Sequence, residues 1–384
     1  MVDALGLPRY WATIWADVLK AGIEDGTRSV YLAAVERLYQ SVINQSGEDC
    51  LDCMLARQDF RGVEAALSGF LTSLRNSSAV DGADRAATWK YALMFVQDVM
   101  THMGPVADQR MGAIDANLVR LDRLYSQIAP THPKPAAPIR ALPAVVIEDL
   151  HRLFAPASPD NPFRSEDLRW RNFLIFLVFL HLGLRRGEVL ILPVNAVKED
   201  YDPTSGLTHY WMNVDETLDE DSRFDAPSLK TKHSRRQLPV SKVIVALADR
   251  VAVNHRFKAL HPFLFSSQQG KPLAIRSATS IFEQVSSALS DRSRKALANR
   301  GKTSVTAHDL RHTCAVYRLA RYRGQGDDMD TAIEKLRVFF GWSPTSEMPR
   351  HYARSYFETS LQEVWEDSYD TFVETIRTID GVPP

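Results

Sequence analysis

The sequence has few cysteines, no long apolar run and almost no net charge. Three cysteines, Cys50, Cys53 and Cys314, are too few for a disulfide framework, which favours a reducing compartment. The longest apolar run, residues 173–182, is about half of what a bilayer crossing needs. The first residues lack the basic and then apolar layout of a signal peptide. We therefore expect a cytoplasmic protein that has no membrane partner.

Sequence signals for nucleotide and metal chemistry are missing as well. The chain contains no glycine-rich loop of the kind that cradles nucleotide phosphates, so nucleotide hydrolysis is not indicated. Cys50 and Cys53 have the spacing of metal ligands, but no second such pair or close histidine pair completes a set of four. We expect neither a metal nor another cofactor.

The net charge of −1 hides an uneven distribution of charge. Residues 1–135 carry 13 Lys and Arg against 16 Asp and Glu, a net charge of −3. Residues 136–355 carry 32 against 24, a net charge of +8, whereas residues 356–384 carry 1 against 7, a net charge of −6. A polyanion such as DNA is therefore expected to bind the middle segment.

The first 130 residues predict helices only. Apolar residues recur at helical spacing near residues 11–19, from a cap at Thr27 to Ile43, and over 63–74, 86–100 and 114–128. Residues 129–138 then contain four prolines, which favour an extended linker. We expect a helical domain at 1–130 and a linker at 131–141.

The second part of the chain predicts a mixture of helices and strands. Helical patterns cover residues 142–154 and 168–182, and they return from Ser241 onward. Residues 190–240 have strand character, with turn residues at 202–206 between two β-rich runs. The predicted fold class is mainly α with a small antiparallel sheet (α+β).

Arg185 and Glu188 stand three residues apart directly after the apolar run. They share one face if that turn is helical. An arginine fork matches two phosphate oxygens, and a nearby carboxylate can hold the fork in place. An ordinary ion pair at a helix end explains the same pattern, and for this pair alone it is the better explanation.

Lys230 opens a basic run that ends at Arg236 and is followed by Gln-Leu-Pro-Val. This order predicts a hairpin with positive charge at its tip. A lysine there could protonate a leaving oxygen if its pKa were lowered. A solvated run of charge explains the pattern equally well.

His308 and Arg311 also stand three residues apart, on a helix that Thr306 is expected to cap and that runs towards Gly324. His312 follows four residues after His308. A histidine and an arginine at this spacing arise by chance roughly once in a chain of this composition, so the pattern alone has a high false-positive rate. A core histidine beside a surface arginine is the alternative.

Trp342 precedes Ser343 and Pro344, which are expected to form the N-cap and first position of a helix. The indole N–H of such a tryptophan can donate to a phosphate oxygen. Tyr352 follows Pro349, which must begin or interrupt a helix and could leave the tyrosine on a separable short element. Taken alone, a core tryptophan and an ordinary surface tyrosine explain both residues.

In this order along the chain, the segments Leu-Arg-Arg-Gly-Glu, His-Asp-Leu-Arg-His and Gly-Trp…Tyr resemble the tyrosine recombinase, or phage integrase, family. The resemblance covers roughly residues 142–358. It implies a mixed, mostly helical catalytic domain there, and a SAM-like helical core-binding domain at 1–130 by position and class only.

The resemblance also implies DNA cleavage by a tyrosine nucleophile. Tyr352 would attack the scissile phosphate and leave the protein joined to the DNA 3′ end. Arg185 and Arg311 would clamp the phosphate oxygens, and Lys230 would protonate the 5′ leaving oxygen. The bond energy would be held in the phosphotyrosine, so neither ATP nor metal would be required.

Supporting roles follow from the same resemblance. His308 would support proton transfer with the tyrosine, and Trp342 would donate to the phosphate. Glu188 and His312 would position the active-site groups. The residues expected to bind DNA are Lys232, Arg235 and Arg236. The open alternatives are Lys232 for Lys230, Arg186 for Arg185 and Tyr356 for Tyr352. Most relatives have histidine where Trp342 stands, and the interval 341–352 is one residue longer than usual.

The function implied is strand exchange between two specific double-stranded DNA sites, with integration or excision of a mobile element as its purpose. A dimer would bind each site and a tetramer would form the synapse, with or without an accessory DNA-bending protein. The acidic helix expected at 359–384, with an apolar stripe over 361–376, would be exchanged between protomers or would pack on its own domain. The alternatives are a type IB topoisomerase that relaxes one duplex and a catalytically silent DNA-binding accessory factor.

Overall fold

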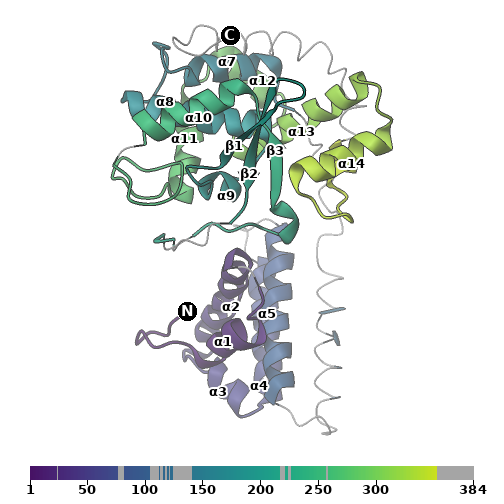
Figure 1. The fold of residues 1–384 in the computed structure, drawn as a ribbon. Helices are drawn as coiled ribbons and strands as arrows, with labels where there is room; N and C mark the ends of the chain where they lie inside the picture. The colour runs from purple at the N-terminus through teal and green to yellow at the C-terminus, as the bar shows by residue number, and fades with distance from the viewer. Residues whose placement is uncertain are drawn as a thin grey trace. The chain divides into compact units, whose positions relative to one another are not determined.

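Contacts in the computed structural model divide the chain into two compact units, Met1–Ala137 and Pro138–Pro384, which are described separately (Figure 1). The structure describes residues 1–352 except 24, 77–81, 104–111, 113–115, 117–118, 121, 124–140, 217–220, 224–225 and 257. The predicted helix at 359–384 and the predicted linker, save Ala141, therefore lie outside the described residues. Within the described ranges, no helix is long and apolar enough to cross a membrane.

The described part of the first unit is helical, as the sequence predicts. Its elements are α1 (Tyr10–Ile14), the π-helical turn η1 (Trp15–Leu19), α2 (Asp25–Ser46), α3 (Leu51–Ala56), α4 (Phe60–Asn76) and α5 (Gly82–Met103). The expected cap at Thr27 is wrong, because α2 already begins two residues earlier. Helix α3 was not predicted, since only Leu51 and Leu55 of its six residues are buried.

The second unit contains the predicted mixture of helices and strands. Its helices are α7 (Ala144–Phe154), α8 (Glu166–Leu177), the π-helical η2 (Val178–Leu182), α9 (Arg186–Leu190), α10 (Lys242–Asn254), α11 (Ile275–Ser287), α12 (Asp291–Ala298), α13 (Ala307–Gly324) and α14 (Met329–Phe340). From Phe173 to Leu180 every residue is buried, because this segment is apolar on all sides and lies inside the unit.

One antiparallel sheet has the order β1 (Val197–Asp202), β2 (Leu207–Val214), β3 (Arg236–Pro239). The predicted turn at 202–206 joins β1 to β2, with Gly206 at a φ of +69°. The basic run is not the tip of a tight hairpin. It lies at the end of the long connection between β2 and β3, partly in the 3-10 turn η3 (Lys232–Ser234).

Two glycines allow the segments around the pocket to approach one another. Gly341 ends α14 with a φ of +60°, and a Cβ there would lie 2.7 Å from the carbonyl oxygen of His233. Gly183 ends η2 with a φ of +58°, and a Cβ there would collide with the ring of Phe340. A side chain at either position would push apart η2, η3 and α14.

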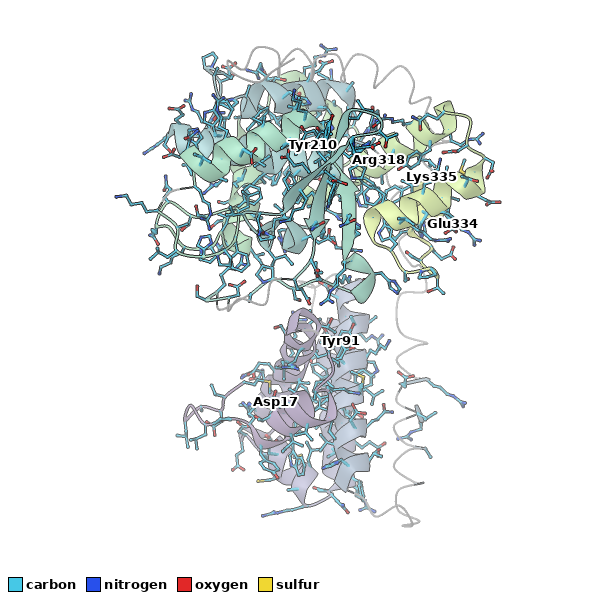
Figure 2. All side chains as sticks on the ribbon, in the orientation of Figure 1. Asp17, Tyr91, Tyr210, Arg318, Glu334 and Lys335 are labelled. Atoms are coloured by element: carbon cyan, nitrogen blue, oxygen red, sulfur yellow. The ribbon has the colours of Figure 1, made fainter. Side chains whose placement is uncertain are left out.

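The expected helix start at Ser343 is wrong, because Gly341 closes the preceding helix and the next helical residue is Met348. Helices α13 and α14 are held together by side-chain contacts. Figure 2 labels Arg318 on α13 and, on α14, Glu334 and Lys335. The guanidinium carbon of Arg318 lies 3.4 Å from the ring centre of Phe339 on α14. Phe339 stands three residues before Trp342, so this contact lies next to the loop that carries Trp342.

Candidate active site

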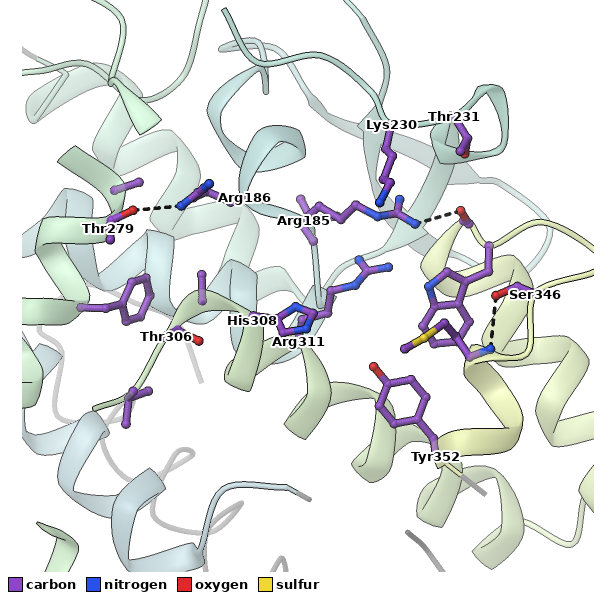
Figure 3. A pocket seen from close by; sticks show the side chains of 18 of the residues that line it. Arg185, Arg186, Lys230, Thr231, Thr279, Thr306, His308, Arg311, Ser346 and Tyr352 are labelled. Atoms are coloured by element: carbon purple, nitrogen blue, oxygen red, sulfur yellow. Dashed lines mark hydrogen bonds between the residues drawn. The ribbon is translucent and has the colours of Figure 1, made fainter. Parts of the chain in front are cut away.

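A pocket of about 760 Å³ in the second unit brings together residues from five separate segments of the chain (Figure 3). They come from the start of α9, the connection before η3, α11, α13 with the residues just before it, and the chain that follows α14. The predicted catalytic residues among its lining are Arg185, Lys230, His308, Arg311, Trp342 and Tyr352.

Glu188, which is 1% exposed, lies close to three arginine side chains beside this pocket. Its carboxylate lies 2.6 Å from Arg185 Nη1, 2.9 Å from Arg236 Nη2 and 3.8 Å from Arg311 Nη1. Burial alone would raise the pKa of Glu188, but Arg236, Arg311 and Arg185 outweigh burial and hold the pKa below its usual value. Three guanidinium groups thus share one carboxylate, which leaves an excess of positive charge beside the cavity.

Arg185 is placed by the start of α9. It is the N-cap residue, and its backbone N–H donates to Glu188 Oε2 over 2.9 Å. Its guanidinium also donates to Ser234 Oγ over 2.9 Å and to the carbonyl oxygen of Gly341 over 3.4 Å. These bonds orient the fork towards the pocket.

Arg311 is 5% exposed and is fixed from several sides. It donates to the carbonyl oxygens of Gly183 and Phe340, the latter over 3.0 Å, and its guanidinium carbon lies 4.8 Å from the ring centre of Phe340. Burial lowers the pKa of Arg311 to about 9, which still leaves it charged at neutral pH. A buried, oriented cation of this kind matches a phosphate oxygen.

The three residues expected to bind DNA have different surroundings. Arg236 has a 6% exposed side chain that donates to Glu188 and to the carbonyl oxygens of Ser234 and Phe339, and it does not line the pocket. Arg235 is exposed and lies 2.9 Å from Glu216. The side chain of Lys232 lies outside the described residues.

Lys230 and Arg186 lie on the open side of the pocket. Both are exposed and line the cavity, and Arg186 donates to Thr279 Oγ1 over 3.0 Å (Figure 3). Arg186 is therefore directed towards α11, whereas Arg185 is directed towards Glu188.

Tyr352 is 1% exposed, so it is not on the loose element that the sequence suggested. Pro349 lies in the first turn of the helix that begins at Met348, a position that a proline tolerates. The Tyr352 ring stacks on Trp342 with ring centres 5.4 Å apart and an angle of 14°. Burial raises the pKa of the Tyr352 hydroxyl, which is therefore protonated at neutral pH.

Helix α13 presents two histidines to this region. Thr306 caps the helix as predicted, and its hydroxyl accepts from the backbone N–H of Asp309. The rings of His308 and His312 lie 4.0 Å apart, and the Tyr352 hydroxyl is 2.5 Å from His312 Nδ1. Partial burial lowers the pKa of His308, and deeper burial next to His308 lowers that of His312 to about 4.

Sequence reasoning placed His308, and not His312, beside the tyrosine. The spacing of four residues from His308 to His312 puts both on one helical face, and this was the only available signal. Among the residues that the structure describes, no three His, Cys, Asp or Glu side chains gather as metal ligands.

Of three comparisons with known proteins, the one with family models identifies a family. The phage integrase family model matches residues 149–359, and no curated protein matches the sequence. A pre-cleavage complex of XerH site-specific recombinase with difH substrate shares 16% identity, with 78% of this chain and 69% of that chain covered and a TM-score of 0.46. A post-cleavage XerH complex with palindromic difH shares 14% identity, with 93% of this chain and 95% of that chain covered and a TM-score of 0.49. XerA recombinase shares 13% identity, with 94% of this chain and 98% of that chain covered and a TM-score of 0.36. Because the family match spans more than half of the 384 residues, the chain belongs to the phage integrase family.

Proposed function

We propose that this protein is a site-specific DNA recombinase that cuts and rejoins DNA through Tyr352. The observation that carries the proposal is the sharing of one buried carboxylate by three guanidinium groups next to a tyrosine hydroxyl. A phosphodiester that enters such a pocket supplies the missing negative charge. The same cations stabilise the additional charge that develops as phosphorus becomes five-coordinate.

In the cleavage step, the Tyr352 oxygen attacks phosphorus and the bond to the 5′ oxygen breaks. Arg185 and Arg311 bind the non-bridging oxygens with planar forks. Lys230, exposed at the pocket, gives its proton to the leaving 5′ oxygen. Trp342 and His308 line the same cavity and complete the contacts to the phosphate and to the tyrosine region.

The product is a 3′-phosphotyrosine that keeps the energy of the broken bond, so rejoining needs neither ATP nor a metal ion. Attack by a 5′ hydroxyl from a second site completes strand exchange. We propose a dimer on each site and a tetramer during exchange, with the helical unit Met1–Ala137 serving as a core-binding domain on the DNA. Integration or excision of a mobile element is the expected biological outcome.

A covalent trap tests this function. The protein is incubated in chelator with a library of nicked duplexes, and DNA that stays on the protein in denaturant is sequenced. We expect recovered DNA joined to Tyr352, and none with Tyr352→Phe, which should still bind duplex. Adducts that form equally well with Tyr352→Phe would reject the nucleophile, and duplex binding without any adduct would favour an accessory DNA-binding factor.

A second assay separates strand exchange from relaxation of a single duplex. One supercoiled plasmid carries a single copy of the recovered site, and a second substrate carries a pair of these sites. A recombinase produces exchanged products only from paired sites, whereas a type IB topoisomerase removes supercoils from the single-site plasmid and yields no exchanged product.

A further inference from the structure

The Tyr352 hydroxyl has one hydrogen-bonding partner among the described residues, and that partner is His312. Nδ1 of the imidazole and the phenolic oxygen lie 2.5 Å apart, and the ring centres are 5.5 Å apart. His308 also contacts the His312 ring, with ring centres 4.0 Å apart and an angle of 69° between the rings. The tyrosine thus touches the second histidine of the helix and not the first.

We propose that His312 is the general base of the cleavage step. Its Nδ1 takes the hydroxyl proton of Tyr352 as the tyrosine oxygen bonds to phosphorus. This inference rests on the proposed function. It makes His312 a catalytic residue, because His312 touches the reacting oxygen, and it gives His308 the role of positioning the His312 ring.

The direction of the hydrogen bond supports this assignment. If Nδ1 accepts, the tyrosine donates its only proton and the imidazole carries its own proton on Nε2. If Nδ1 donated instead, the phenolic proton would need another acceptor, and none is found among the described residues. Acceptance by Nδ1 therefore satisfies both groups.

The protonation states of the two groups fit a proton acceptor and a proton donor. Burial, followed by the neighbouring His308, lowers the pKa of His312 to about 4, so the imidazole is neutral and has a free lone pair at neutral pH. Burial raises the pKa of the tyrosine, so its proton is not lost to water beforehand. A bound phosphate brings negative charge that favours the imidazolium, and bonding to phosphorus makes the phenolic proton more acidic.

The step balances without any further reagent. The Tyr352 oxygen forms a bond to phosphorus, its proton moves to His312 Nδ1, and the bond from phosphorus to the 5′ oxygen breaks. The leaving oxygen takes a proton from Lys230. Rejoining reverses both transfers, so His312 returns the proton to Tyr352.

Replacement of Tyr352 by trifluorotyrosine separates a base from a structural contact, because the hydroxyl of this analogue is far more acidic. On the nicked duplex recovered by the covalent trap, we expect His312→Ala to slow adduct formation at least about 100-fold. The analogue should restore most of that loss in His312→Ala. If the analogue restored the rate of adduct formation in His308→Ala but not in His312→Ala, the assignment would be overturned in favour of His308. If it restored the rate in neither variant, His312 would be only structural.

A sulfur atom in place of the 5′ bridging oxygen provides the matched control for the leaving side. Sulfur departs without a proton, so this substrate should restore the rate of adduct formation in Lys230→Ala. The rate in His312→Ala should stay low. Restoration of His312→Ala by sulfur would place His312 on the leaving group and overturn the proposal.

The hydrogen bond can be tested without DNA, which keeps this inference separate from the proposed function. By nitrogen NMR of the whole protein, we expect a neutral His312 with its proton on Nε2, and a change in the Nδ1 resonance in Tyr352→Phe. A proton on Nδ1, or an unchanged resonance, would overturn the proposal. Failure of the wild-type protein to form any DNA adduct would instead reject the recombinase function.

Discussion

Each unit buries an arginine near a tyrosine, but the two arginines are paired with carboxylates in different proportions. In the first unit, Arg9 is 5% exposed, lies 2.6 Å from Asp49 and sits over the ring of Tyr39. The Tyr39 hydroxyl donates to Asp52. The Arg9 guanidinium and the Tyr39 hydroxyl are therefore each paired with a carboxylate of their own.

In the second unit, Arg185, Arg236 and Arg311 share Glu188, and two of them, Arg185 and Arg311, line a cavity. The comparison shows how one residue pairing can serve two purposes. A matched ion pair stabilises the fold and needs nothing else. An unmatched cluster costs stability and is suited to bind an anion from outside.

The largest expected effect is on the unmatched cluster. Arg311→Ala should slow formation of the covalent DNA adduct by about 10³-fold, because it removes an oriented cation from the phosphate. Arg311→Lys keeps the charge but loses the fork, and it should recover only part of this rate. Single-turnover kinetics on the nicked duplex measures both. An Arg311→Ala protein that folds and cleaves normally would contradict the role of the cluster.

Loss of the Glu188 carboxylate should lower the stability of the protein. Glu188→Gln removes the counter-charge that two buried guanidinium groups, Arg236 and Arg311, share with the partly exposed Arg185, and we expect about 3 kcal/mol less free energy of unfolding. Urea unfolding measures this loss. If the variant were as stable as the wild-type protein, the guanidinium groups would not depend on Glu188.

The same residue predicts a dependence of stability on pH. The pKa of Glu188 in the folded protein lies below its ordinary value of 4.5. Its ionisation therefore contributes stability that is fully present above about pH 4.5 and is lost as the pH falls through the lower folded value. Urea unfolding between pH 3 and pH 7 should show a shallower acid loss for Glu188→Gln than for the wild-type protein, and equal slopes would contradict the shifted pKa.

A change in the matched pair should affect stability alone. Asp49→Asn removes the counter-charge of Arg9, and we expect a loss of about 1 to 2 kcal/mol, since Asp49 is partly exposed. The rate of adduct formation at a temperature where the variant is folded should be unchanged. A large loss of rate would mean that the first unit contributes charge to catalysis.

The smallest effect is expected for the first unit's tyrosine. Tyr39→Phe removes one hydrogen bond to Asp52 and should lower the free energy of unfolding by about 1 kcal/mol. Thermal unfolding measures it, with Tyr352→Phe as the matched variant in the other unit. Tyr39→Phe should still form the DNA adduct, and failure to do so would break the distinction between the two tyrosines.

Much of the fold was predictable from local pattern. Most of the described helices of both units, though not α3, and the turn at 202–206 follow from apolar periodicity and turn residues, and these act over a few neighbouring residues. The prediction failed where local signals competed. Ser343 and Pro344 have the pattern of a helix start, yet a loop follows Gly341. At this point the backbone passes close to η3, next to the carbonyl oxygen of His233.

By itself, the sequence determined which chemical groups are present, their order along the chain and the family to which that order belongs. Tertiary packing decided how those groups are used. Arg236 turns towards Glu188 and away from the pocket, and Tyr352 is buried against His312. These contacts join segments 40 or more residues apart, where no helical or strand period carries information, and burial then sets the charge and the proton positions.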